Sequence, residues 1–140
     1  MALLESYLTF NGNCAEAMRF YERTLNGKMQ MMMTHGESPM GAQVLAADKN
    51  RIMHSRLIID GGQALMAADS MGVEPPEKMS GFALSLGYNT AADATRTFNA
   101  LADGGRITMP LAPTFWVETF GMLVDRFGTP WMVGGGPKSF

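Results

Sequence analysis

His54 and Arg56 are the residues of this sequence whose types and spacing best suit chemistry on a small molecule. Residues 51–60 predict a strand, and side chains two positions apart in a strand lie on the same face. Arginine binds anions, and histidine moves protons near neutral pH. The pair therefore suits an anionic or carbonyl ligand. An equally good interpretation is that both side chains lie at a sheet edge or a dimer edge and are only solvated.

Two hydroxyl groups could join this pair. Tyr7 and Thr9 alternate along the first predicted strand, residues 7–10, and therefore share one face. Either could donate a hydrogen bond to a ligand. For Tyr7 the favoured alternative is that its ring is half-buried and only packs against neighbouring side chains.

The sequence predicts no metal site and no cofactor. A catalytic divalent metal needs about three protein ligands, and no two potential donors near strand ends fall in a metal-binding spacing. Those donors are His54, Asp69, Glu118 and Asp125. A weak metal site near His54 or Asp69 is kept as an alternative. The chain has a single cysteine, Cys14, which excludes a cysteine-based structural zinc site.

Sequence motifs of other enzyme classes are missing. There is no G-x-S-x-G nucleophile turn and no phosphate-binding loop. Residues 134–136 are three glycines near the end of the chain with no predicted helix after them, so we expect a tail. Cys14 opens a predicted helix on its apolar side and is expected to be a small buried residue.

Composition narrows the class of protein. The chain has 140 residues and a net charge of −2. The overall electrostatic field of the protein therefore does not favour binding to nucleic acid or to an anionic membrane. A lone cysteine fits a reducing compartment, and the N-terminus lacks the basic region of a signal peptide, so we expect a cytoplasmic protein. No apolar run approaches the roughly 20 residues of a membrane helix.

The chain contains an internal repeat. Residues 15–21 match residues 92–98 at an offset of 77 in two alanines, an acid, an arginine and an aromatic residue, and Gly27 and Gly104 keep that offset. Each segment predicts an amphipathic helix and is preceded and followed by strand-like runs. A period near half the chain predicts two similar units.

The helix signals are specific. In the first helix we expect an apolar stripe and a capping box of Asn13 and Glu16, with a left-handed end at Asn26-Gly27. In the second, Thr90 is the expected cap. The stripes consist of Cys14, Ala17, Met18, Tyr21 and Leu25, and of Ala91, Ala94, Thr95, Phe98, Leu101 and Ala102.

The strand signals complete each unit. A two-residue turn at Gly61-Gly62 predicts a hairpin, and residues 70–79 predict a linker. The fold class is therefore α+β, with two tandem βαβββ modules, about 1–70 and 80–140, that form a curved mixed β-sheet in one domain, 1–140. Its concave side is the expected ligand site. The expected strands are residues 7–10, 28–34, 51–60, 63–69, 82–86, 106–110, 121–125 and 131–133.

Three stretches of sequence resemble a known family. They are residues 7–21, residues 53–69 and, most specifically, residues 109–131 with Thr114-Phe115-Trp116. Together they resemble the PhnB-like branch of the vicinal oxygen chelate superfamily, which includes glyoxalases, bleomycin-resistance proteins and extradiol dioxygenases. The resemblance implies a homodimer with sites in cavities formed by paired units.

The resemblance also implies where metal ligands would lie. Metalloenzymes of that superfamily carry His or Glu on the first and last strands of each unit. The matching places here are Ser6 or Tyr7, residues 66–68, residues 80–82, and Met132, none of which is a good ligand. Relatives sometimes carry a demethylubiquinone methyltransferase label, but no glycine-rich strand-to-helix turn for such a cofactor occurs here, so we do not expect methyl transfer.

Three hypotheses follow. The first is a metal-independent, dimeric, small-molecule binding protein with a cavity lined by methionine and aromatic side chains. The second is a glyoxalase- or dioxygenase-like enzyme with a non-standard metal site. The third is a protein-interaction module without a ligand. Under the first hypothesis, the ligand-binding residues are Tyr7, Thr9, His54, Arg56 and Trp116.

Overall fold

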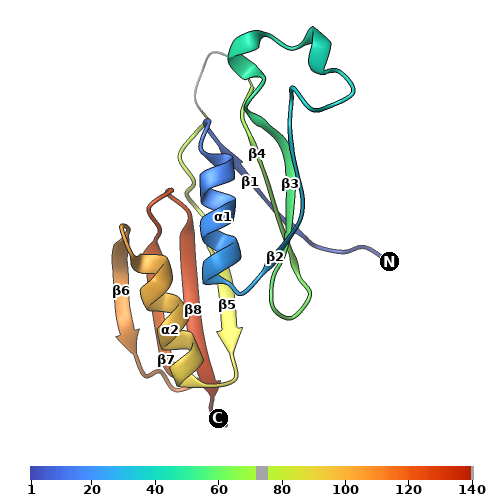
Figure 1. Ribbon diagram of the computed structural model, residues 1–140. Helices are drawn as coiled ribbons and strands as arrows, with labels where there is room; N and C mark the ends of the chain where they lie inside the picture. Colours follow the sequence, from blue (N-terminus) through green and yellow to red (C-terminus); the bar gives the residue numbers. More distant parts are fainter. Residues whose placement is uncertain (72–75, 140) are drawn as a thin grey trace. The chain divides into compact units, whose positions relative to one another are not determined.

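The protein divides into two compact units, Met1–Glu77 and Lys78–Phe140. The structure is a computed structural model that describes residues 1–71 and 76–139. Within the described residues each unit contains one α-helix and four strands, which Figure 1 labels. The first unit contains β1 (Ser6–Phe10), α1 (Cys14–Thr24), β2 (Lys28–Thr34), the short 3-10 turns η1 (Gly41–Gln43) and η2 (Ala46–Asp48), β3 (Ile52–Ile58) and β4 (Ala64–Asp69). The second contains β5 (Leu84–Tyr88), α2 (Ala91–Ala102), β6 (Arg106–Ala112), β7 (Val117–Val124) and β8 (Pro130–Pro137).

Both units have the same topology. The first sheet has the strand order β1-β4-β3-β2, and the second has the equivalent order β5-β8-β7-β6. In each sheet the opening strand is parallel to the last strand, and the other pairs are antiparallel. The chain leaves the opening strand through a helix, which carries it back across the sheet so that parallel pairing becomes possible. A short turn could not do this. The predicted α+β class with tandem βαβββ modules is confirmed. A hollow shared by the two modules stays a prediction.

Each helix covers one face of its own sheet. The predicted stripe of α1 is buried, from Cys14 to Leu25, and α1 packs on β2, β3 and β4. The α2 helix packs on all four strands of the second sheet, as Figure 1 shows. Its predicted stripe is partly right, because Ala94, Phe98 and Leu101 are buried, but Thr97 is buried as well. Among the described residues of each unit, no second helix or strand covers the opposite face of the sheet.

The caps of the two helices differ. Thr90 accepts a hydrogen bond from the Asp93 backbone N–H at 3.1 Å, as predicted. The capping box at Asn13 is wrong, since the Asn13 side chain makes no capping bond. Its place is taken by Asp69 at the end of β4, which accepts from the backbone N–H groups of Gly12 at 2.7 Å and Cys14 at 3.0 Å. A residue 55 positions beyond Cys14 performs the role that local sequence assigned to Asn13.

One turn and one strand boundary differ from expectation. The hairpin after β3 closes over three residues, Asp60, Gly61 and Gly62, because Ile59 and Gln63 still pair. The strand β5 begins at Leu84, two residues later than predicted. The left-handed residue after α1 is Asn26, with a φ of 51°, as expected. The predicted linker 70–79 falls partly on residues 72–75, which lie outside the described residues.

The three glycines near the C-terminus belong to β8 and not to a tail. They extend the strand to Pro137 and pair with β7. A Cβ at Gly135 would lie 2.4 Å from the Thr90 carbonyl oxygen and 2.7 Å from the Ala94 side chain. Glycine is therefore required where the start of α2 crosses the strand closely. Glycine has a low propensity for strands, so the sequence pattern predicted a tail here and not a strand.

Asp69 provides a stability prediction. The Asp69 residue is 5% exposed, and its carboxylate also accepts from the Ile52 N–H at 2.8 Å, so it joins the loop before α1, the start of α1 and the start of β3. Asp69→Ala leaves three backbone donors without an acceptor, and we expect the free energy of unfolding to fall by about 3 kcal/mol or more in urea titrations followed by circular dichroism. The exposed Glu16→Ala change should cost roughly 0.5 kcal/mol or less. Equal losses for both variants would contradict the role of Asp69.

Candidate functional site

The open face of the first sheet carries four of the sequence-predicted ligand residues. Residues paired across neighbouring strands point to the same side of a sheet. Tyr7 pairs with Met66, Met66 with Arg56, and Arg56 with Met31, which makes one row across all four strands. The helix lies on the other side, where Leu57 is fully buried. The row therefore faces away from α1.

A second row lies beside the first. Thr9 and His54 are two residues along their strands from Tyr7 and Arg56, so they share the open face. Thr9 pairs with Ala68, and His54 pairs with Met33. The structure thus brings Tyr7, Thr9, His54 and Arg56 onto one surface among methionine side chains.

Tyr7 and His54 form a direct contact. The Tyr7 Oη and the His54 Nδ1 are 2.9 Å apart, at hydrogen-bond distance, and the two rings stack with centroids 5.6 Å apart and planes 22° from parallel. The pKa of the Tyr7 phenol is raised, mainly by partial burial and secondarily by Cys14. At neutral pH the phenol therefore keeps its proton. The contact spans β4, since Tyr7 lies on β1 and His54 on β3.

Arg56 already has a protein partner. Its Nη2 lies 2.9 Å from the Glu5 carboxylate, and its Nη1 lies 3.3 Å from the Met66 sulfur. Both members of the ion pair are about a third exposed or less, so solvent screens part of their attraction. The local charge of Arg56 is balanced, which lowers the attraction of this face for an anion relative to the sequence-based expectation.

The second unit has an equivalent open face with a different composition. Ser85, Met132, Met122 and Met109 form one row by successive pairing across β5, β8, β7 and β6. The helix side of this sheet is marked by Trp131, Val133 and Leu123, which are buried. The open row is neutral, whereas the matching row of the first unit contains an arginine and a tyrosine.

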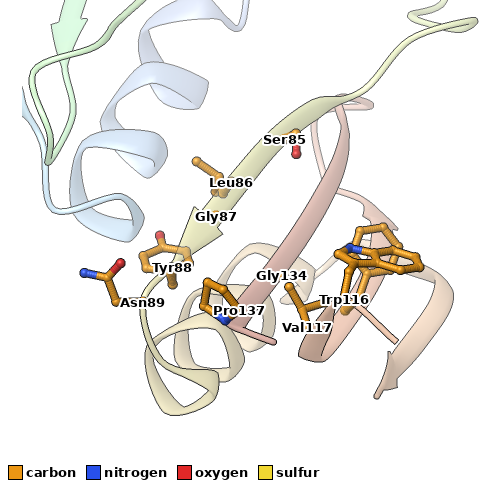
Figure 2. Close-up of a pocket in the computed structure, with 11 residues that line it drawn as sticks. Ser85, Leu86, Gly87, Tyr88, Asn89, Trp116, Val117, Gly134 and Pro137 are labelled. Carbon is orange, nitrogen blue, oxygen red and sulfur yellow. The ribbon is translucent and has the colours of Figure 1, made fainter. Parts of the chain in front are cut away.

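A pocket of about 270 Å³ opens on this second face, as Figure 2 shows. Its floor contains Gly87 and Gly134, which pair across β5 and β8. A Cβ at Gly87 would meet no heavy atom within 4 Å, so the missing side chain leaves open space. The remaining lining residues are Ser85, Leu86, Tyr88, Asn89, Trp116, Val117, Phe120, Gly135 and Pro137.

Trp116 forms the aromatic wall of the pocket. Its ring meets Phe120 edge-on with centroids 5.7 Å apart and Phe115 with centroids 4.9 Å apart. The Trp116 residue is 38% exposed, so part of its surface remains available to a ligand. In Figure 2, Tyr88 and Asn89 lie on the opposite side of Gly134 from Trp116. Trp116 was expected as a stacking contact, whereas Phe120 and the paired glycines were missed.

The sequence contains only a weak indication that these missed residues line a pocket. Gly87 interrupts an apolar strand run, and a strand glycine often marks a close approach or a space. Its pairing with Gly134 depends on register, which requires the positions of both strands. The β8 assignment to residues 131–133 was too short to reach Gly134.

Two of the three carboxylates considered as metal donors have other roles. The Asp69 oxygens accept three backbone N–H groups. The Asp125 carboxylate is buried and accepts from the backbone N–H groups of Phe127 and Thr129 and from the Trp131 indole at 2.8 Å. Glu118 is exposed. Across residues 1–71 and 76–139, no three His, Cys, Asp or Glu side chains gather where they could hold a metal ion.

The strand positions also lack donors of the superfamily type. On the open faces, the opening and closing strands carry Tyr7, Thr9, Met66 and Ala68 in the first unit and Ser85, Gly87, Met132 and Gly134 in the second. None supplies an imidazole or a carboxylate. The residues present therefore do not fit a resident catalytic metal of the kind the resemblance implies.

Cys14 is a structural residue. It is fully buried, and burial raises the pKa of its thiol to about 12, against a smaller lowering by its hydrogen bond with Ser55. The Ser55 hydroxyl donates to the Ala67 carbonyl at 2.7 Å, so the Cys14 thiol is the donor to Ser55. Reactive cysteines have lowered pKa values, and Cys14 has the opposite.

Comparison with known proteins identifies the family. Residues 4–133 match the model of the Glyoxalase/Bleomycin resistance protein/Dioxygenase superfamily. The chain belongs to this superfamily. Protein YjdN of Escherichia coli (strain K12) is 36% identical over 140 residues, which cover 93% of this chain and 92% of that protein. Both findings confirm the superfamily predicted from the sequence.

Solved structures agree with this placement in the superfamily. Protein PA1353 from Pseudomonas aeruginosa is 45% identical, with a TM-score of 0.87 over 96% of this chain and 98% of that one. A PhnB protein from Bacillus cereus, described as a putative 3-demethylubiquinone-9 3-methyltransferase, shares the fold at 24% identity and a TM-score of 0.78, over 96% and 99% of the two chains. The prediction of a PhnB-like member of the superfamily is confirmed. Within the described residues, neither helix combines the length and apolar character needed to cross a bilayer.

The buried, protonated state of the Cys14 thiol leads to a testable prediction. At pH 8, iodoacetamide should alkylate Cys14 in the folded protein about a thousandfold more slowly than in urea, since its pKa rises from 9.0 to about 12. Above pH 9 the unfolded chain ionises this thiol while the folded protein does not, so the free energy of unfolding should fall with rising pH.

Mass spectrometry of timed samples measures the alkylation, and Cys14→Ala, which removes the only thiol, is the control for other sites of modification. Equal alkylation rates in the folded and the unfolded protein would contradict the assignment of Cys14 as a buried, protonated thiol.

Proposed function

We propose that this protein binds a small apolar or aromatic molecule without the help of a metal ion. The observation that carries this proposal is the pocket on the open face of the second sheet, with its glycine floor and its Trp116 and Phe120 wall. Ligand pockets are concave and mostly apolar, with a few polar groups that orient the ligand. This pocket matches that description, with Ser85 and Asn89 as side-chain polar groups.

The shape of the pocket favours a flat ring. Gly87 presents only backbone and open space at the floor, so a planar group can approach the sheet closely there, whereas the Phe120 ring lies against Gly134. Aromatic rings gain additional stabilisation from offset or edge contacts with other rings, about 0.5–1.5 kcal/mol beyond area burial. The volume of about 270 Å³ lies just below the roughly 300–1,000 Å³ of drug-sized ligand sites, so it suits a compound of no more than one or two rings.

The donor set supports independence from metal. Glyoxalase-like or dioxygenase-like chemistry with a bound metal would need about three imidazole or carboxylate ligands on the open faces. The carboxylates Asp69 and Asp125 are engaged by backbone donors and by Trp131, and the strands that usually supply ligands carry none. The alternative of a metalloenzyme with a non-standard site therefore has no set of described residues to support it.

The open face of the first unit is the second part of the proposal. Tyr7, Thr9, His54 and Arg56 are assigned as ligand contacts there. The ion pair of Arg56 with Glu5 balances the charge, so this face favours a neutral ligand over an anion. Neighbouring methionines, such as Met31 and Met66, supply an apolar and adaptable surface.

Binding in the pocket should be visible in fluorescence. Trp116 is partly exposed and Trp131 is 2% exposed, so an aromatic ligand should quench Trp116 selectively. With 2-naphthol as the probe, we expect saturable quenching that disappears in Trp116→Phe. Gly87→Leu should weaken binding at least about tenfold, because the new side chain enters open space in the pocket without a clash.

The control for this test is Lys28→Leu, which adds the same side chain at an exposed position of β2 in the first unit. Its affinity should equal that of the unchanged protein. Affinity should also be the same after treatment with a chelator and after addition of Ni²⁺, Zn²⁺, Mn²⁺ or Fe²⁺. Binding that Gly87→Leu leaves intact would contradict the pocket, and binding or turnover that requires a metal would contradict metal independence.

The proposal has two further parts, a homodimer, which membership in the superfamily supports, and a cytoplasmic location. The lone, protonated Cys14 is compatible with a reducing compartment. Light scattering coupled to size exclusion should give twice the mass of one chain at micromolar concentration. A monomer mass throughout the concentration range would contradict the dimer and leave the pocket of the second unit unaffected.

A further inference from the structure

A row of methionine side chains lies beside the pocket of the second sheet. The pocket floor contains Gly87, which pairs with Gly134 across β5 and β8. Two residues back along β5 is Ser85, which shares the open face with Gly87 because side chains alternate along a strand. The row that Ser85 opens continues through Met132 on β8, Met122 on β7 and Met109 on β6. The pocket and the methionine row are therefore neighbouring parts of one surface.

The methionine row is accessible. Met109 is 45% exposed, and Met122 and Met132 are half-buried. Among the described residues of the second unit, no other helix or strand covers this face. The row carries no charged side chain. An uncovered apolar strip of this kind, continuous with a pocket, is typical of a surface that takes part in binding.

The opposite end of the pocket is polar. In Figure 2, Gly87 lies between Ser85 and Asn89 along β5. The Asn89 side chain is exposed, and its amide has no hydrogen-bond partner among residues 1–71 and 76–139. An amide donates and accepts hydrogen bonds, so it suits a neutral hydroxyl or carbonyl group. The surface thus runs from a polar group at Asn89, over the ring site at Gly87, to the methionines.

From this arrangement we infer that the ligand is a neutral aromatic compound with a linear apolar chain. Its ring occupies the pocket over Gly87, its hydroxyl or carbonyl oxygen contacts Asn89, and its chain lies on Met132 and Met122. This inference rests on the small-molecule binding proposed above and adds the class of ligand to it.

Methionine side chains suit an alkyl chain as a neighbour. They are unbranched, flexible and polarizable, so they adapt to a chain that lies across them. The three methionines lie on adjacent strands, and strands are about 4.8 Å apart, so the row is roughly 10 Å long. A chain of about six to eight carbons covers that length. A charged group on the chain would find no partner in the row.

A second copy of this chain is the alternative occupant of the methionine row. A stable interface between proteins buries roughly 800 Å² on each partner. Three methionine side chains, of which two are half-buried, supply only a small part of that area. The row is long enough for one alkyl chain and is continuous with the pocket, so the ligand is the occupant that the surface favours.

The test compares 2-naphthol with 6-propyl-2-naphthol and 6-hexyl-2-naphthol by isothermal titration calorimetry on the full-length protein. A fully buried methylene group strengthens binding about fourfold, and a chain covered on one side gains about twofold for each methylene. We therefore expect 6-hexyl-2-naphthol to bind about 50-fold more tightly than 2-naphthol. The heat-capacity change of binding should become more negative as the chain lengthens.

Variants of the row locate the chain. Met132→Thr and Met122→Thr should each lower the affinity for 6-hexyl-2-naphthol at least about fivefold and leave that for 2-naphthol within about twofold, because only the chain touches these side chains. Met40→Thr is the matched control, since Met40 is 57% exposed in the loop between β2 and β3 of the first unit. It should leave both affinities unchanged. Circular dichroism establishes that each variant is folded.

A measurement on the unchanged protein makes the test independent of the variants. With carbon-13 in the methionine methyl groups, 6-hexyl-2-naphthol should shift the signals of Met122 and Met132 and leave that of Met18 in place, since Met18 is fully buried in the first unit. The shifts should be much smaller with 2-naphthol. Unshifted Met122 and Met132 signals in the presence of bound 6-hexyl-2-naphthol would overturn the inference.

The outcomes separate this inference from the proposed function. If 2-naphthol binds and the alkyl chains add no affinity, as they would if a second copy covered the row, the chain site is wrong and the pocket stands. A gain in affinity that both row variants leave unchanged also overturns the chain site. If none of the three compounds binds, both the pocket and the chain site are wrong.

Discussion

The coverage of one face of each four-stranded sheet by a single helix is the constraint on which the molecule depends. Because side chains alternate along a strand, this coverage divides the residues of every strand into a buried set and an open set. Leu57, Ser55 and Cys14 belong to the buried side of the first unit, and Trp131 and Val133 to that of the second. Any chemistry the protein performs on its sheets must use the open set.

Asp69 shows how strongly that division is enforced. Its buried carboxylate ties the loop before α1, the first turn of α1 and the start of β3 together through three backbone hydrogen bonds. Satisfying these donors fixes the position of α1 relative to the sheet and so fixes which face stays open. Asp125 performs a comparable role in the second unit by holding the turn before β8 and the Trp131 indole.

The two units use one topology for two surfaces. Equivalent rows contain Tyr7, Met66, Arg56 and Met31 in the first unit and Ser85, Met132, Met122 and Met109 in the second. Methionine is kept at corresponding places, while polar groups occur in the first unit and a glycine floor occurs in the second. The internal repeat therefore keeps the scaffold, while the two open faces differ in composition.

Much of the scaffold could be predicted because its signals are local. The helices, their repeat and the order of helices and strands along the chain follow from apolar periodicity. That Tyr7 shares a face with Thr9, and His54 with Arg56, follows from alternation along each strand. Their common surface, and the Tyr7–His54 contact, could not be predicted, because both depend on register across β4. The Asn13 cap and the glycine tail were wrong because residues distant in sequence, Asp69 and Ala94, decide those positions.

The most direct test is a high-resolution crystal structure of the protein grown with 2-naphthol, with anomalous scattering data collected for transition metals. The account predicts ring density against Trp116 above Gly87 and Gly134, and no metal ion held by protein side chains on either open face. A metal ion bound by three protein donors on such a face, or a ring bound only outside this pocket, would contradict it.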